Sequence, residues 1–458
     1  MNIDELVKKW SNLPHNLLES QLNFNFTNHL WNFLGFHYEA NTPIAGELKP
    51  KFIIYDQFNK PLLVVETKKR VVDLANISEP EFVTSCHSNN LYREAIGNDN
   101  STVNGIRQYL SVKKNPAKYG LVFNGDFFQL FWRSDGLIIP LMEVQKVTKK
   151  TLPKLIYQLD YFLKNPNRAF IVSIWNRKGG IAKTTNIINI AAVLSAYKKR
   201  VLVVDFDPQV DLTRSLGVIP EHFKHKLLRC FDKIQLEEYD AAKKLTEQLI
   251  QKLYFNVKGQ IYPISILPAN KKTLEDFSEY NTDEKYHMPK KATALRKLLS
   301  LVRSKYDYIL IDTSPKTDIL TACSLFAADG VIIPSDYDPE TLRHAKEISC
   351  HFIPKIIRSA RQNSQRKKSL VDEIAPRLLG LVFSNSSNIG VTIEKEVARC
   401  LDELDIKVYK TKLRHCDNVV IAKFFRKPVV FYRPKSQASQ MYIKLTEEIF
   451  MKPNFVEK

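Results

Sequence analysis

The stretch IVSIWNRKGGIAKTT, residues 171–185, decides the fold. Its apolar beginning is typical of a buried strand, its Gly-Gly pair of a tight loop, and the run NIINIAAVLSAY that follows of a helix. Loop amides and a helix N-terminus direct N–H dipoles at phosphate oxygens, and glycines let the backbone approach them closely. In this order Lys183 would bring a cation to the terminal phosphates and Thr184 a hydroxyl to Mg²⁺. The stretch therefore predicts a phosphate-binding loop.

Apolar runs alternate with helical stretches on the C-terminal side of this loop. Short buried strands separated by helices indicate a parallel sheet that is covered on both faces. The predicted strands are Phe170–Trp175, Arg200–Asp205, Tyr308–Ile311, Gly330–Pro334 and Leu378–Phe383. The fold class is therefore α/β, with a parallel-sheet P-loop domain.

The loop departs from the strict pattern G-x-x-x-x-G-K-[ST], because Arg177 and Ala182 occupy its two glycine positions. Lys178, followed by Gly-Gly, instead resembles the deviant Walker A motif K-G-G-x-G-K-T-T of the ParA/MinD family of ATPases. The segment RVLVVDFDPQV (residues 200–210) resembles that family's first switch, and YILIDTSPK (residues 308–316) resembles its Walker B motif. The resemblance covers about residues 168–452.

The resemblance implies an ATP- and Mg²⁺-dependent ATPase that forms a nucleotide-sandwich homodimer. It implies catalytic roles for Lys178, which reaches the partner's phosphates, for Lys183, and for Asp207, which orients the attacking water. The implied metal-site residues are Thr184, Asp205 and Asp312. The implied nucleotide-binding residues are Lys178, Gly179, Gly180, Ile181, Ala182, Lys183, Thr184, Thr185 and Asn385.

Three of these positions leave other interpretations open. Asp205 is alternatively a helix cap, and Asn385 is alternatively only a turn residue. Ala182 stands where the family has glycine, so it would crowd the phosphates or adopt a strained positive φ, at a cost of about 1–2 kcal/mol. We expect ATP binding to survive this and hydrolysis to be slow.

The charge is uneven: of the net +19, the first 165 residues contribute +3 and the rest +16. A positive surface favours polyanions, although a general basic background is the alternative. Clustered cations would neutralise DNA phosphates without sequence preference. The predicted DNA-binding residues are Lys355, Arg358, Arg361, Arg366, Lys367 and Lys368. A second basic set is Arg414, Lys423, Arg426, Lys427 and Arg433.

No apolar run approaches the roughly 18 residues of a membrane-spanning helix. The last residues, EEIFMKPNFVEK, are too short and too acidic for a basic membrane-surface helix. We therefore expect a cytoplasmic, nucleoid-associated protein that does not bind membranes.

The turn formers in KNPNR (residues 164–168) indicate a boundary, giving domains 1–165 and 166–458. The first domain is predicted to have α/β/α layers. It begins with a helical stretch over 17–34, and a hairpin of KFIIYD and PLLVVETKK follows. A helix near 103–112 then precedes the strands YGLVF and FFQLFW.

Within the first domain, residues 46–70 resemble the PD-(D/E)xK nuclease core of the N-terminal domain of type I restriction-enzyme subunits. Glu66 and Lys68 match its E-x-K pair, but Lys51 stands at the position of its metal-binding Asp. Asp56 and Glu47 are the alternative carboxylates. We favour an inactive, DNA-binding relic over an active nuclease, and an unrelated α/β domain remains the third alternative.

Taken together, the sequence predicts a ParA-type ATPase for segregation or positioning of plasmid or other mobile-element DNA. A partition-type DNA-binding protein would be its partner. The alternatives are an ATP-switched nuclease effector in defence or DNA processing, and a DNA-bound scaffold that binds ATP without turnover.

Overall fold

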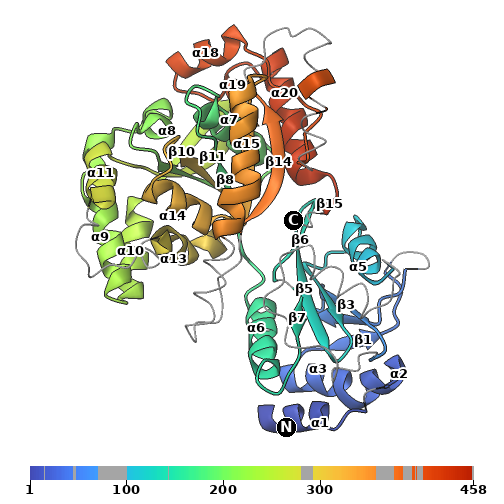
Figure 1. Cartoon of the computed structure of the whole chain (residues 1–458). Helices are drawn as coiled ribbons and strands as arrows, with labels where there is room; N and C mark the ends of the chain where they lie inside the picture. Colours follow the sequence, from blue (N-terminus) through green and yellow to red (C-terminus); the bar gives the residue numbers. More distant parts are fainter. Residues whose placement is uncertain are drawn as a thin grey trace. The chain divides into compact units, whose positions relative to one another are not determined.

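The computed structural model describes residues 1–14, 16–44, 48–70, 101–142, 144–279, 292–356, 376–384, 395–397, 399 and 406–455. The chain divides into two compact units (Figure 1). The first contains Met1–Pro166 and a C-terminal segment that begins at Lys452, and the second begins at Asn167. The sequence-based boundary lies one residue before this division. The structure differs from it in returning the segment from Lys452 to the first unit.

The second unit is built on a sheet of seven described strands in the order β10-β11-β9-β12-β8-β13-β14. All neighbours are parallel except β10 and β11, which form an antiparallel hairpin at one edge. The strands are β8 (Phe170–Ile174), β9 (Val201–Phe206), β10 (Gln251–Val257), β11 (Gln260–Leu267), β12 (Tyr308–Thr313), β13 (Gly330–Ser335) and β14 (Arg377–Phe383).

Helices cover both faces of this sheet. The main ones are α7 (Lys183–Ala196), α8 (Asp211–Ser215), α9 (Lys226–Gln235), α10 (Tyr239–Leu249), α11 (Lys271–Glu279), α13 (Ala294–Ser300), α14 (Ile319–Ala327), α15 (Pro339–Glu347), α18 (Asp417–Phe424), α19 (Val429–Tyr432) and α20 (Gln437–Thr446). Helices α9, α13 and α14 pack on the face that carries Ile309 and Ile311. On the other face α7 contacts β9, β11 and β12 as well as α20, so almost all of it is buried.

The first unit has a mixed sheet in the order β1-β2-β3-β4-β5-β6-β15, with β7 paired to β5. Its strands are β1 (Tyr38–Ala40), β2 (Phe52–Tyr55), β3 (Pro61–Thr67), β4 (Tyr119–Phe123), β5 (Phe127–Ser134), β6 (Leu137–Pro140), β7 (Gln145–Lys146) and β15 (Asn454–Phe455). Because β15 pairs with β6, the C-terminal segment completes the sheet of the N-terminal unit.

The described helices of the first unit are α1 (Ile3–Ser11), α2 (Glu19–Leu22), the π-helical turn η1 (Asn23–Thr27), α3 (Asn28–Leu34), α5 (Ser101–Ser111) and α6 (Leu152–Lys164). Helix α5 packs closely on β3 and β4. A Cβ added at Gly120 of β4 would lie 2.5 Å from Ile106 Cγ2 of α5, so only glycine allows this approach.

The predicted parallel sheet and all five strands predicted for it are confirmed, with ends shifted by at most two residues. The hairpin of β10 and β11 was not predicted. The alternating exposed pattern of β10 comes from a sheet edge, whereas the predicted strands are buried on both faces. No described helix is long and apolar enough to cross a membrane.

Candidate functional site

The loop between β8 and α7 is held in place by a buried asparagine and has open space beside its two glycines. Asn176 is fully buried; its Nδ2 donates to Pro334 O at 2.9 Å and its Oδ1 accepts from the Lys178 N–H at 3.1 Å. A Cβ added at Gly179 or Gly180 would meet nothing within 4 Å. The loop therefore holds its shape while its glycines leave space for an anion at the N-terminus of α7.

Ala182 adopts a positive φ, which is one of the two outcomes that the sequence left open for it. Its φ of 62° and ψ of 25° lie in the left-handed region, immediately before the first residue of α7. For a residue with a Cβ this conformation costs about 1–2 kcal/mol relative to a right-handed one, whereas glycine adopts it readily. The strain is therefore part of the loop.

We expect Ala182→Gly to raise the free energy of unfolding by about 1 kcal/mol, because glycine relieves this strain. Urea unfolding of the nucleotide-free full chain measures the effect. Ala196→Gly is the matched control: Ala196 is exposed in the last turn of α7, where glycine should destabilise by about 1 kcal/mol. A loss of stability in both variants would contradict the strain argument.

Lys183 and Thr184 lie where the sequence predicts them, at the start of α7. Lys183 is 7% exposed, and its Nζ donates to Lys178 O at 3.0 Å. Burial lowers its pKa, while Asp312 and Asp207 partly offset that effect. Thr184 Oγ1 donates to Asp312 Oδ2 at 2.6 Å, so the predicted metal-site hydroxyl and Walker B carboxylate are in direct contact.

Carboxylates gather at the ends of the neighbouring strands β9 and β12, where Asp205 and Asp312 are paired in register. Burial, with the nearby Asp205 carboxylate, raises the pKa of Asp312 well above its usual value. Burial likewise raises the pKa of Asp205 to about 7. Asp207, 9% exposed, adds to the negative potential, and its Oδ1 accepts from the Gln209 N–H at 3.0 Å.

This arrangement fits a magnesium ion that is held mainly by non-protein oxygens. Within the described residues, no group of three or more His, Cys, Asp or Glu side chains could hold a metal ion. Mg²⁺ keeps several waters and commonly takes only one or two protein oxygens together with substrate phosphates. Asp312 Oδ1 is buried and has no partner in the described part of the chain, so it is available to a water on the ion.

Asp205 has a structural role in addition to any role near the metal. Its Oδ2 accepts hydrogen bonds from the Thr213 N–H at 2.8 Å and the Thr213 hydroxyl at 2.6 Å, at the first turn of α8. Asp205 therefore binds the first turn of α8 from within β9, although the N-cap residue of α8 is Val210. The metal role of Asp205 stays a prediction.

Lys178 contacts two carboxylates that the sequence analysis did not single out. Its Nζ lies 2.9 Å from Asp336 Oδ2 and 2.6 Å from Asp338 Oδ2. Hydrogen bonds to Asp338 and then Asp336 raise the pKa of Lys178. Asp338 also caps α15 through the Glu340 N–H, and an Asp before Pro339 is a helix-start signal that could have identified it.

A second cluster of polar side chains lies at the end of β3 in the first unit. Glu66 Oε1 lies 3.4 Å from Lys68 Nζ, and its Oε2 accepts from the Tyr109 hydroxyl at 3.3 Å. Burial raises the pKa of Glu66, although Lys68 and Lys51 oppose the shift. Glu19 Oε1 lies 3.0 Å from Lys51 Nζ.

Glu19 and Tyr109 were missed by the sequence analysis because both come from helices distant in sequence from the strand. Lys51 faces Glu19 and Lys68 faces Glu66, so each of these two cations is paired with a carboxylate.

Asp56 is not a substitute for the missing carboxylate. Its Oδ1 accepts the Phe58 and Lys60 N–H groups, both at 2.9 Å, in the turn of the β2–β3 hairpin. Lys51 lies at the other end of that hairpin, because its N–H donates to Val65 O. Across the strand between them, at roughly 3.3 Å per residue, Asp56 cannot reach the cluster. The other alternative, Glu47, lies outside the described residues.

Several predicted residues also lie outside the described residues. They are Arg358, Arg361, Arg366, Lys367, Lys368 and Asn385. Lys355 is described and is exposed to solvent.

Comparison with known proteins places the similarity in the second unit. The model of a family described as AAA domain matches residues 169–366. An uncharacterized protein of Pseudomonas putida is 31% identical over 281 residues, which cover 61% of this chain and 94% of that protein. The chromosome partitioning protein ParA of Caulobacter vibrioides is 28% identical over 294 residues, covering 62% and 94% of the two chains.

Among solved structures, the chain matches cobyrinic acid a,c-diamide synthase from Mycobacterium smegmatis with bound ADP and magnesium. That match has 21% identity and a TM-score of 0.43, and it covers 61% of this chain and 93% of the synthase.

Proposed function

Because its C-terminal part belongs to the ParA/MinD family of P-loop ATPases, we propose that this chain is an ATPase that dimerises around ATP and binds DNA without sequence preference. One observation carries the ATPase proposal. Thr184 at the start of α7 donates to Asp312 at the end of β12, beside the buried Lys183 and an open glycine loop. These are the groups that position and neutralise a nucleoside triphosphate with its metal.

Each residue of the proposed ATP site then has a defined role. ATP with Mg²⁺ supplies the transferable phosphoryl group and the neutralising metal charge. The loop amides and Lys183 would bind phosphate oxygens, and Thr184 and Asp312 would hold the metal ion. Asp207 orients the attacking water. Lys178 leaves Asp336 and Asp338 to reach the phosphates in the partner subunit, where it acts as an arginine finger does.

We propose segregation or positioning of DNA, specifically of a plasmid or another mobile element, as the process that uses this ATPase. The Caulobacter relative is named for chromosome partitioning, and residues 166–458 of this chain carry a net charge of +16, which favours binding to a polyanion such as DNA. A DNA-binding partner protein would couple the ATPase to its cargo.

ATP with Mg²⁺ should double the mass of the protein in light scattering. Asp207→Ala should hold the dimer together, because it removes the residue that orients water and leaves Lys183, Thr184 and Asp312 in place. Nucleotide that binds without any change in mass would contradict the sandwich mechanism.

For the first unit we propose a nuclease-like domain that no longer cuts DNA. Metal-dependent hydrolysis needs carboxylates that converge on the ion. In the described residues Glu66 is instead paired with Lys68, and Lys51 with Glu19. An ammonium group at the metal position repels a divalent cation.

The purified full chain should therefore show no DNA cleavage with Mg²⁺ or Mn²⁺, with or without ATP. Lys51→Asp should create a Mn²⁺ site, measurable by calorimetry, because it would add a carboxylate beside Glu19 and Glu66. Glu66→Ala should leave ATP hydrolysis unchanged. Cleavage by the unmodified chain that Glu66→Ala abolishes would contradict this proposal and favour the ATP-switched nuclease effector.

A further inference from the structure

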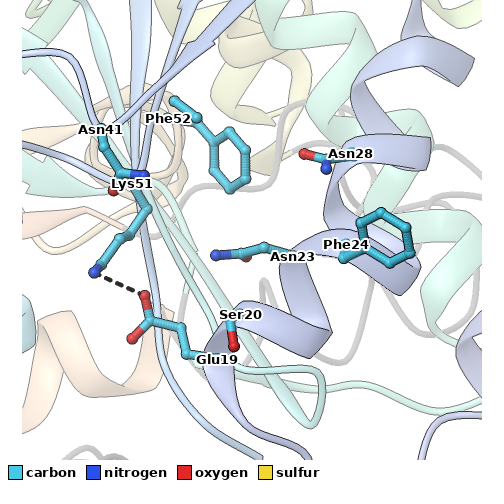
Figure 2. Close-up of a pocket in the computed structure, with 9 residues that line it drawn as sticks. Glu19, Ser20, Asn23, Phe24, Asn28, Asn41, Lys51 and Phe52 are labelled. Carbon is cyan, nitrogen blue, oxygen red and sulfur yellow. Dashed lines mark ion pairs between the residues drawn. The ribbon is translucent and has the colours of Figure 1, made fainter.

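A groove of about 470 Å³ opens in the first unit between the helical segment that begins at Glu19 and the edge strand β1 with its neighbour β2. Figure 2 shows the side chains of Asn23, Asn28 and Phe52 directed toward one shared space, with the Lys51–Glu19 ion pair at its side. The nuclease-like proposal uses Lys51 and Glu19 but gives no role to the rest of this groove.

Three carboxamide side chains line the groove, those of Asn23, Asn28 and Asn41. Within the described residues none of them makes a hydrogen bond, and Asn23 Oδ1 is buried without a partner. A buried polar group left unpaired costs about 1–3 kcal/mol. A polar ligand that donates a hydrogen bond to Asn23 Oδ1 would remove this cost.

The backbone is shaped to bring two of these amides together. Residues five apart lie about 140° apart around an ordinary α-helix. Asn23 and Asn28 are five apart, but η1 is a π-helical turn in which the Asn28 N–H donates to Asn23 O. The wider turn places both residues on the groove side, and such turns are frequent at functional sites.

The remaining lining favours a flat, uncharged ring. Phe52 is 2% exposed, with its ring toward the groove (Figure 2). Phe24 also lines the groove and is 74% exposed, and its ring points away from Asn23 in that view. Aromatic side chains stack on unpaired bases, and an amide offers a donor and an acceptor in one plane, as the edges of bases require. Glu19 and Lys51 neutralise each other, so the groove itself does not select an anion.

We propose that this groove binds an unstacked nucleobase, supplied either by single-stranded nucleic acid or by a free nucleotide. The proposal does not depend on the ATPase, because every group it uses belongs to the first unit.

The test uses the full chain without ATP and a fluorescein-labelled oligothymidylate of about twelve nucleotides in fluorescence anisotropy. Phe24→Ala should weaken binding about tenfold, the effect expected for one lost stacking contact. Phe58→Ala is the matched control: Phe58 is 72% exposed but lies in the β2–β3 turn, so its loss should leave affinity unchanged. Photocrosslinking with 5-bromodeoxyuridine in the same oligonucleotide should label the peptide that contains Phe24.

Competition distinguishes the two sources of the base. Displacement by mononucleotides at concentrations similar to the oligonucleotide indicates a free nucleotide, whereas displacement only by longer strands indicates single-stranded nucleic acid. Equal effects of Phe24→Ala and Phe58→Ala, or crosslinks confined to the second unit, would overturn the proposal. Absence of binding to both oligonucleotide and mononucleotides would overturn it as well, and would leave a peptide as the candidate to examine.

Discussion

Lys178→Ala should lower the rate of ATP hydrolysis by at least about 10³-fold and abolish the ATP-dependent dimer. A cation supplied to the transferring phosphoryl group from a partner is worth about 10³–10⁵ in rate. Lys183 would remain to bind the phosphates within the same subunit, so nucleotide affinity should fall much less than the rate. The rate of phosphate release measures the loss of hydrolysis, and light scattering with ATP measures the loss of the dimer.

The same substitution should hardly change stability. The ion pairs of Lys178 with Asp336 and Asp338 are partly exposed, and such pairs contribute only about 0–1 kcal/mol. Arg177→Ala is the control, because Arg177 precedes Lys178 in the loop and makes a comparable ion pair with Glu347 at 2.5 Å. If Lys178→Ala and Arg177→Ala lowered the rate of hydrolysis equally, the loss would come from a change in loop structure. It would then not come from the loss of a cation that Lys178 gives to the partner subunit.

In the second unit, the sequence was sufficient to predict those site residues whose chemical role depends on the local order of strand, loop and helix. A buried strand, a glycine loop and a helix start must follow one another to bind phosphate, so Lys183 and Thr184 could be placed from spacing alone. Asp312 was assigned through the resemblance of residues 308–316 to the Walker B motif. The contact between Thr184 and Asp312 agrees with this reasoning.

The sequence was insufficient to predict contacts between side chains that only the tertiary fold brings together. Lys178 pairs with Asp336 and Asp338, about 160 residues later in the chain. The hydrophobic pattern of the sequence does not predict a contact between side chains so far apart. Glu19 and Tyr109 reach the Glu66 cluster from helices on either side of the hairpin in sequence. The π-helical turn at Asn23 was also missed, because its residues are compatible with an ordinary helix.

The ATP-bound dimer should bind duplex DNA of any sequence, and salt should weaken that binding steeply. Each phosphate that a Lys or Arg neutralises releases a counterion, so about six contacts make affinity fall by about 10³ between roughly 50 and 200 mM salt. Dimerisation doubles the basic surface presented to one polyanion. DNA binding should therefore require ATP, and Lys178→Ala should weaken it even though it lies outside the basic clusters.

Reversal of charge at Arg358, Arg361, Lys367 and Lys368 to glutamate should abolish this binding and flatten the salt dependence. The matched control reverses four exposed cations around α9 and α10, namely Lys224, Arg229, Lys243 and Lys244. Both variants change the net charge by the same amount, so a purely long-range effect of the +19 chain would weaken binding equally in the two. Loss confined to the first variant locates the contacts, because only local cations release counterions on binding. If the first variant retains binding, the DNA surface lies elsewhere on the chain, and the second basic set near Arg433 becomes the one to reverse.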